Sequence, residues 1–120
     1  MRLAQFVLPG EGGNAILTLS SAGGSVDQNF VRWRGQFEGT PGEEAGALPS
    51  GTRWIRLSGT YLDKPSPMAP GPGTPKPDSV MHGAVIGPEG EALFVKAWGP
   101  KATLDTHRGA IDAFVASAAR

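Results

Sequence analysis

The two histidines, His82 and His107, are the side chains best suited to acid–base chemistry near neutral pH. Neither has the spacing to other histidines or to carboxylates that metal-binding motifs show. Cysteine is absent, which excludes thiolate catalysis and Cys-ligated metal sites. No G-x-S-x-G turn is present to hold a hydrolase nucleophile. We therefore name no catalytic residue, expect no metal and no cofactor, and favour a protein that is not an enzyme.

The positions of the two histidines leave two interpretations open. His82 shares an alternating register with Val80, Ala84 and Ile86, and His107 falls on the apolar stripe of a predicted C-terminal helix. Packing and hydrogen bonding are the favoured roles for both. In the other interpretation, His82 transfers protons at the wall of a cleft.

Four arginines lie close to tryptophans in the sequence, an arrangement that could stack on RNA bases. The chain balances 11 basic with 11 acidic residues and has no basic run, which argues against nucleic-acid binding. We expect these arginines to extend from a solvated face. They are Arg32, Arg34, Arg53 and Arg56, beside Trp33 and Trp54.

The elements that must position these side chains follow from the periodicity of the apolar residues. Alternation predicts strands at 2–8, 15–20, 53–61, 80–86 and 92–98, with hairpins joining the first two and the last two. Helical spacing predicts a second helix from Gly99 and Pro100 to the end of the chain. Residues 1–120 form a single α+β domain, an antiparallel sheet of about five strands packed with two helices in the order β-β-α-β-β-β-α.

The first helix, over 25–37, has two independent signals. Ser25 and Gln28 form a capping-box pattern at its start. We expect Gly35 to lie inside this helix, packed closely against the sheet. The apolar residues recur at spacings of four, three and four: Val26, Phe30, Trp33 and Phe37. The segment that follows, 38–51, has no usable period and is predicted to be a loop.

Trp54 lies on the opposite register from Ile55, Leu57 and Tyr61, which we assign to the core. It is therefore either covered by a second layer or left exposed as a contact surface for a partner. Both alternatives stay open.

The segment 63–79 holds six of the eleven prolines. Proline fixes φ and cannot donate to a sheet ladder, so we expect an extended loop that forms neither a helix nor an edge strand. It is interpreted either as the rim or ligand of a partner site, with Met68 as an adaptable apolar contact, or as a dispensable insertion.

Several stretches together resemble a family of uncharacterised bacterial proteins that are often envelope-associated or lipoprotein-like: "MRLAQFVLPG", "GGSVDQNFVRWRGQFE", "LSGTYLDKPSPM", "HGAVIGPEGEALFVKAWGP" and "AIDAFVAS". The order of elements also resembles the PsbP-like fold, shared by the extrinsic subunit of photosystem II and a Ran-binding nuclear import factor. This resemblance implies a binding or assembly role.

We therefore predict a non-enzymatic binding or assembly module that uses the proline-rich loop and nearby exposed aromatic residues to contact a protein. The alternative is a small-molecule-binding protein or enzyme with a cleft near His82. We expect no insertion into a membrane, because no segment has the roughly 18 apolar residues of a span. The sequence leaves the localisation open between the bacterial cell envelope, if an export signal has been removed, and the cytoplasm. The candidate binding residues are Trp54, Met68, His82, Arg56 and Trp33.

Overall fold

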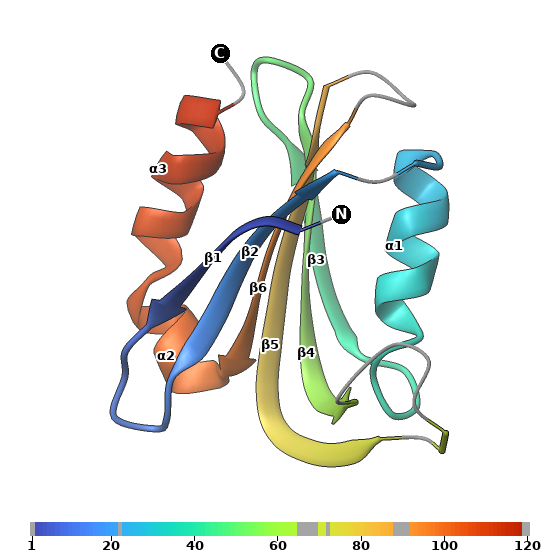
Figure 1. The fold of residues 1–120 in the computed structure, drawn as a ribbon, viewed down its shortest axis with the longest axis vertical. Helices are drawn as coiled ribbons and strands as arrows, with labels where there is room; N and C mark the ends of the chain where they lie inside the picture. Colours follow the sequence, from blue (N-terminus) through green and yellow to red (C-terminus); the bar gives the residue numbers. More distant parts are fainter. Residues whose placement is uncertain (1, 22, 65–69, 72, 88–91, 119–120) are drawn as a thin grey trace.

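The computed structural model describes residues 2–21, 23–64, 70–71, 73–87 and 92–118. In these residues, one antiparallel sheet of six strands lies between α1 and the pair α2 and α3 (Figure 1). The strands are β1 (Arg2–Leu8), β2 (Ala15–Ser21), β3 (Gly42–Ala47), β4 (Arg53–Asp63), β5 (Thr74–Ile86) and β6 (Leu93–Pro100). The helices are α1 (Val26–Arg34), α2 (Lys101–Thr106) and α3 (Arg108–Ala118). The α+β class and the antiparallel sheet are confirmed.

The strand order is β1-β2-β6-β5-β4-β3, with β1 and β3 at the two edges. Both predicted hairpins are present, because β1 pairs with β2 and β5 pairs with β6. Among the described residues, no helix is long and apolar enough to cross a membrane.

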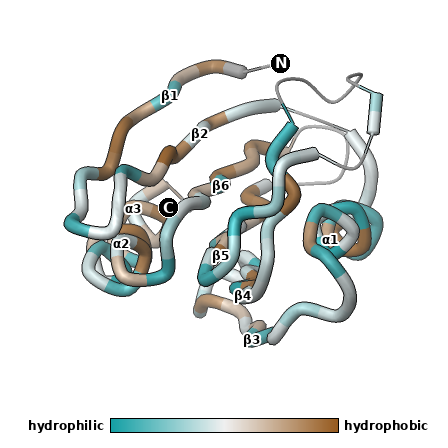
Figure 2. The backbone as a smooth tube through the Cα atoms, turned by 90° about the horizontal axis from the view of Figure 1, so that it is seen from below, coloured by the Kyte–Doolittle hydropathy of each residue, from teal (hydrophilic) through white to brown (hydrophobic). Residues whose placement is uncertain are grey.

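Two apolar cores lie on the two faces of the sheet, and β5 contributes to both. Met81 and Val85 belong to the core beneath α1, whereas Val80 and Ala84 belong to the core beneath α2 and α3. This explains why almost every residue from Val80 to Ile86 is apolar: a strand covered on both sides has no solvent face to alternate with. Figure 2 shows hydrophobic residues along the central strands.

The helix α1 begins as predicted. Ser25 Oγ accepts a hydrogen bond from Gln28 N–H, and Gln28 Oε1 accepts one from Ser25 N–H. The helix ends at Arg34, so the expectation that Gly35 lies inside it is wrong; Gly35 is the C-cap. The close approach to the sheet occurs instead at Gly83, where an added Cβ would lie 2.5 Å from Trp33 Cζ3.

The predicted loop 38–51 contains an edge strand, β3, so that expectation was wrong. All of β3 is exposed or half-buried, which removes the apolar alternation that marks a strand. An added Cβ on Gly46 would lie 2.9 Å from Trp54 Cζ2, and glycine there lets β3 pack over the indole. Helices on both faces bind its adjacent glutamates: Arg34 of α1 binds Glu43, and Arg108 of α3 binds Glu44.

The C-terminal helix is divided in two at His107, which is the C-cap of α2. His107 Nε2 lies 2.7 Å from the carbonyl oxygen of Pro9 in the β1–β2 connection. Thr103 Oγ1 donates a second hydrogen bond, 2.6 Å long, to Gly13 O in the same connection. The two contacts hold α2 against the end of the first hairpin.

The proline-rich segment is only partly the loop that we expected. β4 extends to Asp63 and β5 begins at Thr74, with Asp63 opposite Thr74 and Leu62 opposite Pro75. Residues 74–76 and 79 are therefore paired with β4, on either side of a bulge at 77–78, and the prediction that this part of the segment avoids the sheet is wrong. Met68 lies outside the described residues.

Candidate binding site

A cleft of about 840 Å³ opens at the end of the sheet where β5 begins and β6 ends. Trp98 of β6, which is half-buried, and Tyr61 of β4, which is 9% exposed, supply the aromatic part of its lining. In Figure 1 this end of the sheet is the one where β5 curls beneath β4. The charged residues that line the cleft are Asp63, Lys76, Asp78, Lys101 and Asp105.

One wall is Lys76–Ser79 of β5. It belongs to the first part of that strand, Thr74–Ser79, which runs beside β4 alone until Ser79 meets Pro100 of β6. Leu62 N–H donates to Gln36 O, on the side of β4 that faces away from β5. Leu62 and Pro75 are therefore a non-hydrogen-bonded pair of the antiparallel ladder, in which the backbone N–H and C=O groups of both residues point away from the partner strand. Pro75 therefore occupies a position whose N–H would have faced the open side. Its proline ring removes that donor, and strand addition at this edge is disfavoured.

A bulge in the β4–β5 pairing reshapes this wall. The register shifts between Gly59 and Tyr61, and opposite it Asp78 has φ of 51°, the only positive φ of a non-glycine residue among those described. Aspartate tolerates this left-handed conformation better than most residues do. Ser79 fixes the turn by donating a 2.8 Å hydrogen bond to Lys76 O.

Lys96 lies over both aromatic rings of the cleft. Its ammonium lies 5.0 Å from the Trp98 ring centroid and 5.9 Å from that of Tyr61, and it donates a 2.7 Å hydrogen bond to Gln36 Oε1. Burial, with a smaller contribution from the charge of Asp63, raises the pKa of Tyr61 to about 12. A phenol with the usual pKa of about 10 is already neutral at physiological pH, and burial keeps Tyr61 neutral there as well.

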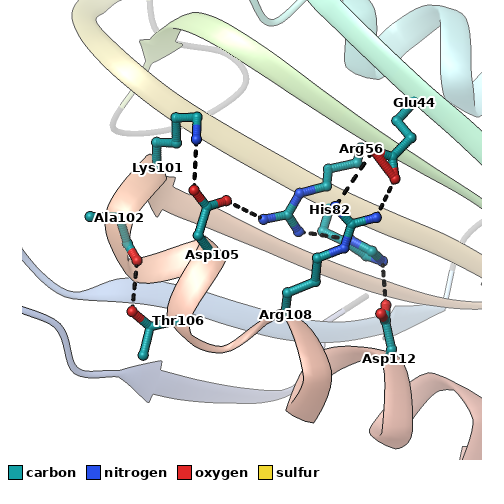
Figure 3. A network of polar contacts seen from close by, with 9 residues as sticks. All are labelled: Glu44, Arg56, His82, Lys101, Ala102, Asp105, Thr106, Arg108 and Asp112. Carbon is teal, nitrogen blue, oxygen red and sulfur yellow. Dashed lines mark hydrogen bonds and ion pairs between the residues drawn. The ribbon is translucent and has the colours of Figure 1, made fainter.

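A second polar group of residues lies on the opposite face, beneath α2 and α3 (Figure 3). Arg56 Nη1 lies 3.1 Å from His82 Nδ1, and Arg56 Nη2 donates a 3.0 Å hydrogen bond to Asp105 Oδ1. Asp105 also binds Lys101 at 2.7 Å. We call Arg56, His82, Asp105 and Lys101 the Arg56 network. It meets the cleft at Lys101 and Asp105, which belong to both.

His82 is 2% exposed and lies outside the lining of the cleft. Burial, followed by the nearby positive charge of Arg56, lowers the pKa of His82 to about 4. Because Arg56 can only donate, Nδ1 must accept, and the ring proton lies on Nε2, 3.6 Å from Asp112 Oδ1. The arrangement stabilises a neutral imidazole in the core.

The structure brings three of the candidate residues together: Trp54, Arg56 and His82. Trp54 is half-buried and stacks on His82. Of the two alternatives for this side chain, the structure shows the one in which it is covered. Arg56 is only 7% exposed, so the expectation that it extends into solvent is wrong, whereas Arg32 and Arg53 are exposed. Trp33 is 2% exposed in the core beneath α1, so we remove it from the candidate binding surface.

Sequence reasoning named none of the cleft-lining residues individually, although its interpretation of 63–79 as the rim of a partner site covers Asp63 and Lys76–Ser79. Trp98 was assigned only to a strand, although its place directly before Gly99 and Pro100 puts it at a strand end, where ligand sites often form. Lys76 and Asp78 lie in the segment interpreted as the rim of a partner site, but Met68 was the contact named there. Nothing in the sequence marks Asp105 as part of a site, because its partner Arg56 lies 49 residues away.

Among the described residues, no group of three or more histidine, aspartate or glutamate side chains is placed to hold a metal ion. Comparison of the chain with protein-family models, with curated proteins and with solved structures gave no match.

Proposed function

We propose that the protein is a non-enzymatic binding module whose cleft accepts an extended segment of a partner protein. The observation that carries the proposal is the cleft of about 840 Å³ with Trp98 and Tyr61 in its wall. Clefts of this size are typical of binding sites, and Trp and Tyr are enriched among the residues that dominate binding energy.

The distribution of side chains supports a protein ligand. Protein interfaces combine an aromatic centre with a polar rim. Here Trp98 and Tyr61 provide the aromatic surface, and Lys76, Asp78 and Lys101 provide side chains of both charges. A partner would bury the half-exposed face of Trp98 and exchange hydrogen bonds with these side chains.

The stiffness of the β5 wall also supports binding. Pro75 and Pro77 restrict the backbone, and Ser79 Oγ donates to Lys76 O and to Pro77 O, at 2.8 and 3.4 Å. A wall already in its bound shape loses little conformational entropy when a ligand arrives.

The alternative, a small-molecule binder or enzyme with a cleft near His82, has less support. His82 contacts Arg56 and Trp54 in the interior, with 2% of its surface exposed. In the cleft, Asp105 is already engaged by Lys101 and Arg56, and the hydroxyl of Ser79 is engaged by backbone carbonyls. These bonds suit positioning better than proton transfer.

A PsbP-like fold is part of the proposal, and the antiparallel sheet with helices on both faces supports it. A binding or assembly role is what that resemblance implies.

The experiment starts from a displayed library of random peptides selected on the wild-type protein. Selected peptides are titrated against a variant in which residues 65–72 are replaced by a short Gly-Ser turn. We expect the variant to keep most of the affinity, because Trp98, Tyr61 and the charged residues of the cleft, which carry the proposed contacts, are unchanged in it. Failure to select any peptide, or selection of peptides that bind only the replaced segment, would contradict the cleft as the binding site.

A further inference from the structure

Prolines remove backbone donors from the strands that border the cleft. Pro77 of β5 and Pro100 of β6 line it, and Pro75 directly precedes Lys76 in the β5 wall. Proline has no N–H to donate. A strand that joins a sheet needs N–H and C=O groups in alternation along the strand beside it, and these positions do not supply them. An extended ligand in the cleft is therefore not held by a β-ladder.

The cleft contains a hydroxyl that has no partner in the described part of the chain. Tyr61 lines the cleft with only 9% of its surface exposed. Its ring packs against Phe37 and Trp98, and its hydroxyl hydrogen-bonds to no described residue. Among these residues, every fully buried side-chain nitrogen or oxygen has a partner, so the Tyr61 hydroxyl is not fully buried. A ligand oxygen can accept the hydrogen bond that the chain leaves unmade.

Trp98 provides a second donor beside the first. The ring centroids of Tyr61 and Trp98 are 6.4 Å apart, with an angle of 38° between the planes. Trp98 is half-buried, and its indole N–H hydrogen-bonds to none of the residues that the structure describes. The cleft thus offers two adjacent aromatic rings, each carrying a donor that no described residue uses.

The conformation of a protein segment decides how well it satisfies these donors. An α-helix uses its carbonyl oxygens in its own hydrogen bonds, and a strand requires the ladder that the prolines of the walls deny. A polyproline II helix has no internal hydrogen bonds, so its carbonyl oxygens stay free to accept. Its proline rings also dock on aromatic surfaces.

We propose that the cleft selects proline-rich segments in the polyproline II conformation. Proline rings of the ligand pack on Tyr61 and Trp98, and its main-chain carbonyl oxygens accept hydrogen bonds from the Tyr61 hydroxyl and the Trp98 indole N–H. This inference rests on the proposed function, because it names the class of protein segment that the cleft binds. The restricted backbone of such a segment loses little conformational entropy on binding.

The peptides selected from the displayed library test the inference. In those whose binding depends on Trp98, we expect prolines three residues apart, which lie on one side of a polyproline II helix. Replacing these prolines by alanine should weaken binding at least about fivefold, measured by fluorescence anisotropy. Trp98-dependent peptides without such prolines, or an unchanged affinity after the replacement, would overturn the inference and leave the proposed function standing. If no selected peptide depends on Trp98, both fail.

Tyr61→Phe tests the contact on the protein itself, because it removes the hydroxyl and keeps the ring. Binding of the selected peptides should weaken about threefold or more, as loss of one hydrogen bond does. The free energy of unfolding in urea should stay unchanged, since no described residue bonds to this hydroxyl. Val31→Ala, exposed outside the cleft lining, should change neither quantity. Equal peptide affinities for Tyr61→Phe and the wild type, or a clear loss of stability in Tyr61→Phe, would overturn the inference.

Discussion

The indole of Trp54 stacks on the imidazole of His82, with ring centroids 5.6 Å apart and an angle of 9° between the planes. The two residues come from the paired strands β4 and β5, where Arg56 lies directly opposite His82. The indole covers one face of the imidazole, and Arg56 occupies its Nδ1 edge. This packing keeps His82 in the structural role that the first interpretation of the sequence favoured.

The free energy of unfolding should fall as the pH falls from about 6.5 to about 4. The folded-state pKa of His82 is lowered to about 4, from the usual 6.5, so the unfolded chain binds more protons between these values. At 1.36 kcal/mol per pKa unit, the loss attributable to His82 is at most about 3 kcal/mol. Urea denaturation at a series of pH values measures it.

His82→Phe should remove this part of the pH dependence, while His107→Gln should retain it. If His82→Phe and the wild type lose the same free energy of unfolding between pH 6.5 and 4, the lowered pKa of His82 is not the cause.

Substitution of Arg56 should affect both stability and the titration of His82. Arg56→Met keeps the apolar stem but removes the hydrogen bonds to His82 and Asp105. Asp105 retains Lys101 and its side chain is 47% exposed, so we expect a loss of only about 1–2 kcal/mol in the free energy of unfolding. The pKa of His82, followed by NMR, should rise because a nearby positive charge is gone. If the pKa of His82 is the same in Arg56→Met and in the wild type, Arg56 does not lower the pKa of the imidazole.

The sequence predicted the elements whose side chains are buried on a regular period. The capping box at Ser25 and the apolar stripe through Phe30 and Trp33 predicted α1, and alternation predicted five of the six strands found in the described residues. β3 was not predicted, because its side chains face solvent and its pairing depends on β4. Its strand conformation is imposed by tertiary contacts, which local periodicity does not record.

The site was less predictable than the fold because its residues come together only through long-range pairing. Prolines argued against a strand at 74–79, yet Pro75 fits one because its missing N–H faces the open side. The burial of Arg56 likewise depends on Asp105 and His82, which are distant in sequence. Residue type alone favours an exposed arginine.

The contact between Gly83 and Trp33 predicts a clear difference between two glycine substitutions. Gly83→Ala places a methyl group 2.5 Å from the indole of Trp33, inside the core, and should lower the free energy of unfolding by about 1–3 kcal/mol. Gly109→Ala, in α3, meets no atom within 4 Å and should raise it by up to about 1 kcal/mol. Thermal or urea unfolding of both variants measures the difference. Equal effects would contradict the packing of α1 on the sheet.

The affinity of the selected peptides for Trp98→Ala tests the proposed binding function most directly. Val31→Ala is the matched control, since Val31 is exposed on α1 outside the cleft lining, and circular dichroism establishes that both variants are folded. If the cleft binds the peptides, Trp98→Ala should weaken binding at least about 30-fold, as removal of a central aromatic contact does, and Val31→Ala should leave it unchanged. Equal affinities for the wild type and Trp98→Ala would contradict the cleft as the binding site.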